Sequence, residues 1–547
     1  MAKYTSLNEV PDSIKSSIGR YVSDIHGDVF VLRNLPPEMA GGILARYSRS
    51  PHGLRLTLVN EFLDEVGNPI QAKGTELLER VLIGFGDDSV GELEGAHIGI
   101  ENISQIATKY IEDRRIGGSP IEQSTRYVKY DKMENGKWKY LRPKEIMESG
   151  FKERFERTND RAFEIYKDAI DRLFNYFKEE LPKSKFKIEI ERGGIKVECG
   201  ENELLNESEI RAFNTAYNFT IRCAALDVGR CVLPSSTLTN LGLFGNGRFY
   251  TNLITHLKSS NLLELQEKGI EIERALNSEI PTFIKRNKID DRFKEIDDKM
   301  REISKKLFSN VKPELNQVTL LPREEFLDEV VASSLYPYTN VSLTQIMKKI
   351  KELPIEKKLE IINVYKGKRN NRRDRTGRGL EAGYPITFDL VGGFAEYRDL
   401  ERHRMLTQQR QTLTTELGFI MPYEMEVIGL KNEIEELESI MSNLNSDMRH
   451  AGLYEVSQYA TLFNHKIRWM MGMNLREFQH LSELRTTPQG HFSYRSMVME
   501  MARLLGERDG WVKNLIEYVD YSDPGNKISR AKEQSRIARE SLKKKID

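Results

Sequence analysis

Apolar residues recur along much of the chain at the spacing of an amphipathic helix. This period predicts helices over 96–111, 155–180, 209–230, 251–276 and 424–448. Residues 185–199 instead alternate in period two around Gly193-Gly194, which predicts a β-hairpin with a two-glycine turn. The chain is therefore expected to combine long helices with antiparallel strands.

Residues 113–127, DRRIGGSPIEQSTRY, carry the first group of candidate polar residues. After a Gly-Gly break, Ser119 and Pro120 predict the start of a helix, with Glu122 in a capping box. A helix N-terminus suits a phosphate, and Arg126 follows Glu122 by one turn. An ordinary capped helix with a Glu122–Arg126 pair accounts for the same residues.

Residues 402–414, RHRMLTQQRQTLT, form a cationic cluster with Arg398 just before it. If the segment is helical, Asp399 shares a face with Arg402 and His403. A solvated, salt-bridged helix face is the alternative interpretation, because acidic residues are interleaved.

The overall charge gives no bias toward nucleic acid or an anionic membrane, since 83 basic residues balance 83 acidic ones. We expect no nucleic-acid partner, no membrane span and a cytoplasmic location, because no apolar run reaches about 18 residues and the N-terminus lacks an apolar core. The three cysteines predict buried thiols, and no metal-ligand spacing is present, so no metal site is expected.

Composition also predicts the segments that lie outside the folded domains. Residues 1–27 are a lead-in, 286–315 a charged helical connector and 524–547 a charged tail. The basic run 366–378 favours a solvated loop, with a phosphate-contacting loop as the weaker alternative.

An internal repeat relates 28–285 to 316–523, with the hairpin near 185–199 inserted in the first copy. IEDRRI at 111 matches LERHRM at 400, and VGRCVLP at 228 matches VSQYATL at 456. Asp113 stands where the second copy has Arg402, and Arg230 stands where it has Gln458. Lys258 and Lys268 stand opposite Arg485 and Arg495. Neither copy holds a full set of arginines, but the two together do.

These segments resemble the flavin-dependent thymidylate synthases, whose signature is close to RHRxxSxxxxSxRY. Arg402-His403-Arg404 matches its first part and Ser124 with Arg126-Tyr127 its second. The segment 230–234, RCVLP, and the run from Leu484-Arg485 to Arg495 match the later arginine motifs. The chain resembles the tandem members of about this length, as in chlamydial homologues, more than it resembles the short enzymes. The flavin-contacting histidine of the family is replaced by Leu93 and Ala382, and Asp399 and Thr407 replace its glutamine and serine.

The resemblance implies reductive methylation of dUMP to dTMP, with methylenetetrahydrofolate as carbon donor and NADPH as reductant through FAD. It implies one composite site shared by the two copies. Arg126, Arg402 and Arg495 would be catalytic. The implied substrate-binding residues are Glu122, Gln123, Ser124, Arg126, Arg230, Arg402 and Arg495. The implied cofactor-binding residues are Arg402, His403, Arg404, Arg485 and Glu122. A second cleft with Asp113, Gln458 and Lys268 would be inactive, because Asp113 repels a phosphate.

The fold that the resemblance implies is α/β (α+β): two tandem thymidylate synthase-complementing-type units, each an antiparallel sheet with long helices. A homodimer would then be equivalent to a pseudo-tetramer. Two alternatives stay open, an enzyme of the same scaffold acting on another uridine nucleotide and a non-catalytic nucleotide-binding paralogue.

Overall fold

The computed structural model describes most of the chain. The described residues are 3–48, 50–84, 90–192, 194–291, 313–321, 326–335, 348–367, 378–382 and 386–525, with the single positions 294, 298, 369 and 376. Most of the expected connector, most of the basic run 366–378 and nearly all of the charged tail lie outside the described residues. The described chain forms two compact units, the first made of 1–103, 107–122 and 239–311, and the second of 104–106, 123–238 and 312–547.

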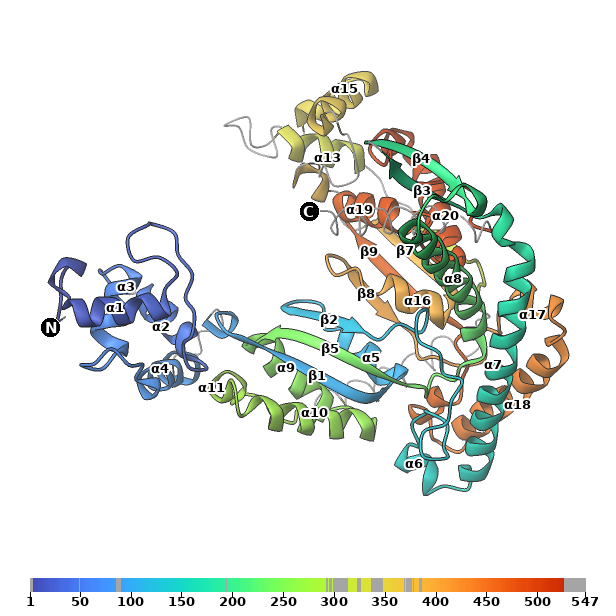
Figure 1. Ribbon diagram of the computed structural model, residues 1–547, viewed down its shortest axis with the longest axis horizontal. Coiled ribbons are helices and arrows are strands. Elements are labelled where there is room, and N and C mark those ends of the chain that lie inside the picture. Colours follow the sequence, from blue (N-terminus) through green and yellow to red (C-terminus); the bar gives the residue numbers. More distant parts are fainter. Residues whose placement is uncertain are drawn as a thin grey trace. The chain divides into compact units, whose positions relative to one another are not determined.

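The first unit contains a three-stranded sheet in the order β1-β5-β2. Helices α9 and α10 lie along one side of this sheet (Figure 1). Its strands are β1 Gly95–Ser104, β2 Gly118–Glu122 and β5 Leu238–Asn246. Its helices are α1 Asp12–Tyr21, α2 Met39–Tyr47, α3 Leu54–Thr57, α4 Gln71–Leu78, α5 Gln105–Glu112, α9 Gly247–Lys258, α10 Leu263–Leu276 and α11 Pro281–Ile284.

The second unit contains a four-stranded sheet in the order β6-β7-β9-β8 and the separate hairpin β3-β4. Its strands are β3 Lys187–Arg192, β4 Ile195–Gly200, β6 Val318–Leu320, β7 Ile386–Gly393, β8 Thr407–Arg410 and β9 Lys466–Met473. Its helices are α6 Lys144–Met147, α7 Lys152–Glu180, α8 Glu207–Gly229, α13 Phe326–Leu335, α15 Ile355–Lys366, α16 Phe394–Leu400, α17 Tyr423–Val427, α18 Lys431–His450, α19 Leu475–Arg485 and α20 Phe492–Arg508. The mixture of long helices and small antiparallel sheets confirms the α/β (α+β) class.

The repeat is visible in the order of elements. The first copy runs β1–α5–β2 and later β5–α9–α10, and the second runs β7–α16–β8 and later β9–α19–α20. In each sheet the last of the three strands lies between the other two. Both sheets therefore have the same strand order, as a tandem duplication requires.

Equivalent residues of the two copies also meet inside the second unit. Pro234 and Leu462 occupy matching positions of the repeat and face each other in an antiparallel bridge. The Ser235 N–H donates to the Thr461 carbonyl at 2.9 Å, and the Phe463 N–H donates to the Leu233 carbonyl at 2.9 Å. Exchanging matching positions turns one hydrogen bond into the other, which is the property of a two-fold contact.

Two predicted helices are wrong. Residues 96–104 form β1, where Ala96 and Ile100 are buried and their neighbours His97 and Glu101 are exposed. This alternation has period two, so the strand period outweighs the helical spacing of the isoleucines. The helix begins only at Gln105.

The capped helix expected at Ser119 is strand β2, in which Ser119 pairs with Phe244. Pro120 is tolerated because β2 lies at the sheet edge. The Gly-Gly pair is required rather than merely flexible: Gly117 has φ +84°, and a Cβ at Gly118 would lie 2.5 Å from the Phe249 ring. No helix N-terminus is present there to bind a phosphate.

The remaining predicted elements agree with the structure in part. Helices α7 and α8 and the hairpin β3-β4 fall where the pattern places them, and all three cysteines are buried. The helix expected over 251–276 is divided into α9 and α10, and that over 424–448 into α17 and α18. Strand β9 is not among the elements that the sequence pattern predicted.

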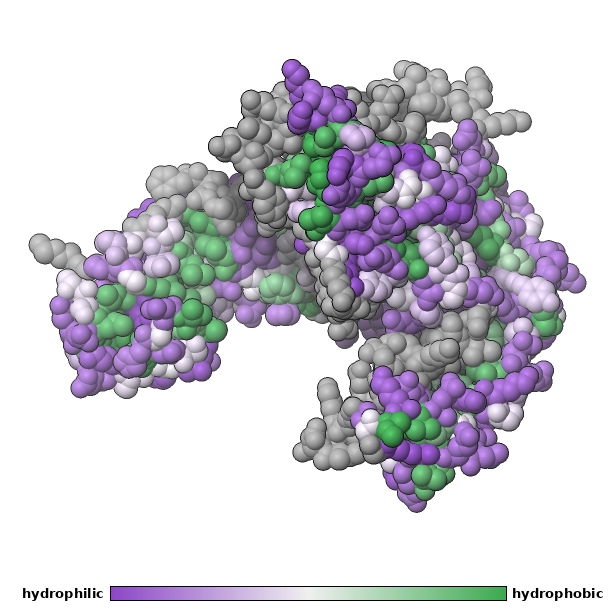
Figure 2. Space-filling view, turned by 90° about the horizontal axis from the view of Figure 1, so that it is seen from above, coloured by the Kyte–Doolittle hydropathy of each residue, from purple (hydrophilic) through white to green (hydrophobic). Residues whose placement is uncertain are grey.

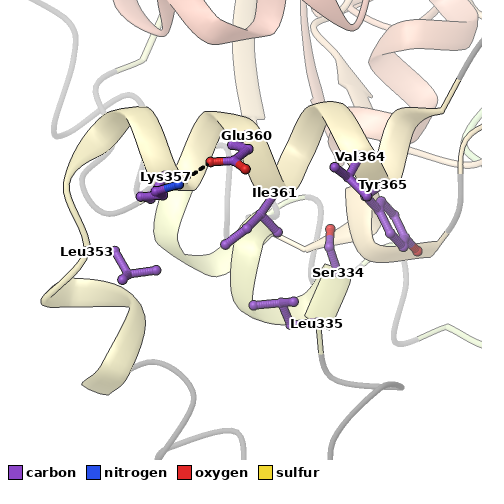
Figure 3. Close-up of a pocket in the computed structure, with 8 residues that line it drawn as sticks. All are labelled: Ser334, Leu335, Leu353, Lys357, Glu360, Ile361, Val364 and Tyr365. Atoms are coloured by element: carbon purple, nitrogen blue, oxygen red, sulfur yellow. Dashed lines mark hydrogen bonds and ion pairs between the residues drawn. The ribbon is translucent and has the colours of Figure 1, made fainter.

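Helices α13 and α15 border a mostly apolar pocket of about 780 Å³, with Leu335 and Ile361 between the two helices (Figure 3). Of the chain that joins these helices, 336–354, residues 336–347 lie outside the described residues. Seen from above, polar residues cover most of the visible surface, with apolar residues gathered in separate patches (Figure 2).

Candidate functional site

The second unit brings arginines and carboxylates from both copies together. Arg126, in the turn after β2, donates from Nε to Asp227 Oδ1 at 2.7 Å and from Nη2 to Asp227 Oδ2 at 3.1 Å. Its Nη2 also reaches the carbonyl of Gln489 at 3.4 Å. Burial opposes the charge of Arg126, but the Asp227 carboxylate outweighs it and raises the pKa of the guanidinium. Arg126 of the first copy is thus held against the loop of the second copy that carries Gln489.

A second ion pair joins the copies directly. Arg230 and Asp399 are both buried, and Arg230 Nη2 donates to Asp399 Oδ2 at 3.2 Å. Burial alone would raise the pKa of Asp399, but neighbouring guanidinium groups hold that pKa well below its usual range. The arginines responsible, in decreasing order of effect, are Arg230, Arg126, Arg402 and Arg485.

One polar atom of this pair has no hydrogen-bond partner among the residues that the structure describes. Arg230 Nε is fully buried and donates no hydrogen bond to any residue that the structure describes. A buried donor without an acceptor is costly, roughly 1–3 kcal/mol. An oxygen acceptor placed against this atom would remove that cost.

Glu396 and His491 lie next to these ion pairs. The Glu396 carboxylate accepts from the Gly393 N–H at 3.1 Å and is hydrogen-bonded to the Ser493 side chain. Burial raises the pKa of Glu396 to about 7, partly offset by those hydrogen bonds. His491 Nδ1 lies 2.6 Å from Ser493 Oγ, and burial, then the charge of Arg230, lower the pKa of His491 to about 4. Two groups titrating far from their usual values are therefore linked through Ser493.

His403 is held between two charged groups. Its Nδ1 lies 2.8 Å from Glu477 Oε1, and its Nε2 accepts from Arg485 Nε at 2.9 Å. Burial, and then the charge of Arg485, keep the pKa of His403 well below its usual value. The ring is therefore neutral at pH 7 and has both nitrogens in use.

The arginines on either side of His403 differ from it in exposure, since Arg402 and Arg404 are exposed while His403 is 4% exposed. The expected shared helical face of Asp399, Arg402 and His403 is wrong, because α16 ends at Leu400. The segment alternates outward and inward instead.

Arg495 is placed differently from the other predicted site arginines. It is 1% exposed and donates from Nε to the Thr486 carbonyl at 2.9 Å and from Nη2 to Ser522 Oγ at 3.2 Å. It holds the chain after α20 against the end of α19. Its predicted contact with substrate stays a prediction.

The remaining predicted residues are divided between the units. Gln123 and Ser124 belong to the second unit, where Ser124 Oγ accepts from the Arg126 N–H at 3.3 Å. Glu122 belongs to the first unit, buried 3.1 Å from Lys109 Nζ. Asp113 and Lys268, assigned to the inactive cleft, also lie in the first unit, and Gln458 lies buried in the second.

Several residues of the cluster were not singled out from the sequence, namely Asp227, Glu396, Glu477 and His491. Asp227 lies 101 residues after Arg126, and Glu477 lies 74 after His403. The only local signal was the position of Asp227 just before the matched arginine segment at Arg230.

Neither metal nor membrane features stand out in the described part of the chain. No cluster of three His, Cys, Asp or Glu suited to a metal ion is found among those residues. None of the described helices is both long and apolar enough to cross a membrane.

Comparison with known proteins places this arrangement in a family. The model of the thymidylate synthase complementing protein family matches residues 44–282 and 384–509. The chain belongs to this family. Membership indicates a function related to thymidylate synthesis.

Relatives of similar length match this chain over nearly its whole length. A UPF0159 protein of Chlamydia muridarum is 34% identical over 95% of this chain and 97% of its own length. One of Chlamydia pneumoniae is 35% identical over 93% and 95%, and one of Thermoplasma acidophilum is 29% identical over 88% and 95%. The tandem form is thus not peculiar to this chain.

Proposed function

We propose that the protein is a flavin-dependent thymidylate synthase with one composite active site, which methylates dUMP to dTMP. The observation that carries this proposal is the meeting of Arg126 and Arg230 from the first copy with the Asp399 segment of the second, at 3.2 Å between Arg230 and Asp399. Guanidinium groups make paired, charge-assisted hydrogen bonds to phosphate and carbonyl oxygens, which a pyrimidine nucleotide offers in quantity.

In the proposed roles, Arg126 and Arg230 bind the nucleotide together with Arg402, Gln123 and Ser124. Arg126 is held in place by Asp227 before any ligand arrives, so little side-chain freedom would be lost on binding. Arg230 still has its buried Nε–H to offer. Positioning and polarisation of the pyrimidine are what this set of residues can supply.

The residues present also fit a flavin. Arg402 and Arg404 are exposed on either side of buried His403, an arrangement suited to the phosphates of FAD. Arg485, with its guanidinium fixed at Nε by His403, would be a further contact. FAD, reduced by NADPH, would supply the hydride for the methyl group that comes from methylenetetrahydrofolate.

Two further parts of the proposal concern assembly. The two-fold contact between Pro234 and Leu462 is of the kind that two subunits make across a dimer axis. One chain would then be equivalent to a dimer of single-copy proteins, and a homodimer to a tetramer. A cytoplasmic enzyme is also expected, since its substrates are found there.

The experiment is tritium release from C5-labelled dUMP with FAD, NADPH and methylenetetrahydrofolate supplied. Release matched by dTMP is expected, because the methyl group replaces the C5 hydrogen. Release without dTMP would favour an enzyme of the same scaffold with another product. No release and no flavin binding would favour a nucleotide-binding paralogue and sink the proposal.

Matched variants test the composite site. Arg126→Ala and Arg402→Ala, one in each copy, should each abolish dTMP formation. Asp113→Ala, at the position that matches Arg402 in the repeat, should leave activity unchanged. Loss of activity in Asp113→Ala together with an active Arg402→Ala would show that the roles of the two copies are reversed.

A further inference from the structure

The guanidinium of Arg485 has one edge in use and another available. Its Nε–H donates to His403 Nε2 at 2.9 Å. Its two terminal nitrogens, Nη1 and Nη2, donate no hydrogen bond to any described residue. The side chain is only partly buried, with the ring of Tyr494 at 5.9 Å from the guanidinium carbon. Arg485 is thus oriented by one contact while its terminal fork stays open.

The proton on His403 can be placed from its partners. An arginine Nε–H only donates, so His403 Nε2 must be the acceptor and carries no proton. The proton of the neutral ring is therefore on Nδ1, which donates to Glu477 Oε1 at 2.8 Å. Glu477, His403 and Arg485 thus form a continuous chain of two hydrogen bonds, with Arg485 Nε as donor at one end and the Glu477 carboxylate as acceptor at the other.

This chain rests on a rigid support. Glu477 and Arg485 belong to the same helix, α19, whose residues Phe478 and Leu481 are fully buried. His403 comes from the segment before β8, and it is nearly enclosed itself. In metal sites, a carboxylate often accepts from one nitrogen of a histidine ring and so fixes the orientation of the other nitrogen toward the metal. Here the Glu477 carboxylate fixes the His403 ring in the same way, and the ring orients Arg485.

We propose that Glu477 and His403 are positioning residues for Arg485, holding its terminal nitrogens toward a ligand with paired oxygen acceptors. The proposal rests on the function proposed above, in which that ligand is the nucleotide or the flavin. Both ring nitrogens of His403 are then engaged with Glu477 and Arg485, whereas the resemblance implied that His403 itself lies against the flavin. His403 acts through Arg485.

The first test measures ligand affinity in His403 variants, with dUMP by calorimetry and FAD by flavin fluorescence. His403→Leu removes the acceptor for Arg485 and should weaken one ligand by about tenfold or more, since a hydrogen bond to a charged group is lost. His403→Gln places an amide oxygen near the old Nε2 and should restore most of the affinity. The ligand that is weakened identifies the source of the oxygens.

A double-mutant cycle separates positioning from general stability. If His403 acts through Arg485, His403→Leu should cause no further loss of affinity in an Arg485→Ala background. Losses that simply add would overturn the proposal. Glu483→Gln is the matched control: Glu483 lies on the same helix and pairs with Arg369 at 2.7 Å rather than with His403. It should lower stability while leaving both affinities within about threefold.

The second test needs no ligand. Histidine-selective ¹⁵N NMR of the full protein, with His403 assigned through His403→Gln, should show Nδ1 protonated and Nε2 unprotonated at pH 7. A protonated Nε2 would overturn the proposal even if the enzyme is active. If the wild-type protein binds neither dUMP nor FAD while His403 shows the expected tautomer, the proposed function fails and the hydrogen-bonded chain stands.

Discussion

Glu396→Gln should change the way in which the stability of the second unit depends on pH. In the folded protein the pKa of Glu396 is about 7, against an ordinary value of 4.5, because the carboxyl is buried. The folded state therefore keeps a proton that the unfolded state releases between these values. Stability from this group is fully present below pH 4.5 and is lost as pH rises through 7, by roughly 3 kcal/mol in all.

His491 acts in the opposite direction. Burial lowers its pKa to about 4 from an ordinary value of 6.5, so the unfolded state binds a proton that the folded state refuses. Stability from His491 is complete above pH 6.5 and is lost as pH falls toward 4. Between about pH 4.5 and 6.5 the two slopes oppose each other, and in the wild-type protein they nearly cancel.

Glutamine keeps the shape of the side chain and can still accept from the Gly393 N–H and donate to Ser493. It removes only the titration. The gain in unfolding free energy of Glu396→Gln over wild type should grow from about zero at pH 4.5 to roughly 3 kcal/mol at pH 7.5. All other titrating groups are shared by the two proteins and drop out of the difference.

Tryptophan fluorescence during urea unfolding is a suitable assay. The three tryptophans, Trp138, Trp469 and Trp511, all lie in the second unit, so the signal reports on that unit alone. The exposed Glu426→Gln is the control and should follow wild type at every pH. A difference between Glu396→Gln and wild type that is the same at pH 4.5 and 7.5 would refute the reasoning.

Two further predictions concern packing and a buried ion pair. Gly118→Ala should destabilise the first unit by about 1–3 kcal/mol, because the new Cβ would lie 2.5 Å from the Phe249 ring. Thermal unfolding followed by circular dichroism measures this loss. An unchanged unfolding midpoint would mean that β2 can shift away from the ring at no cost. Arg369 and Glu483 are each 2% exposed in their side chains and joined at 2.7 Å, so Glu483→Leu alone should cost about 3–5 kcal/mol. Adding Arg369→Met should recover much of that loss in urea unfolding, since no buried charge is then left unpaired, and a further loss in the double variant would contradict this account.

The sequence by itself determined the elements with strong local patterns. The period of α7 and α8 and the two-glycine hairpin at β3-β4 follow from short-range spacing, which local backbone preferences and burial enforce. The repeat comparison also indicated that Arg126 and Arg230 belong with the second copy. The structure brings Arg230 of the first copy to Asp399 of the second. That the two copies share one active site stays a prediction.

Only the tertiary structure decided which pattern prevailed where two competed. Ser119-Pro120 reads as a helix start, yet pairing with β5 and the close approach of Phe249 to Gly118 make it an edge strand. Likewise, α16 ends at Leu400, so Asp399 is buried while Arg402 is exposed.

The partners of the site residues depended wholly on the fold. Arg126 meets Asp227 across 101 residues, and His403 meets Arg485 across 82. Local sequence patterns cannot predict such pairs, because the partner of a side chain depends on which elements pack together. The shifted pKa values of Glu396 and His491 have the same origin, since burial exists only once the chain has folded.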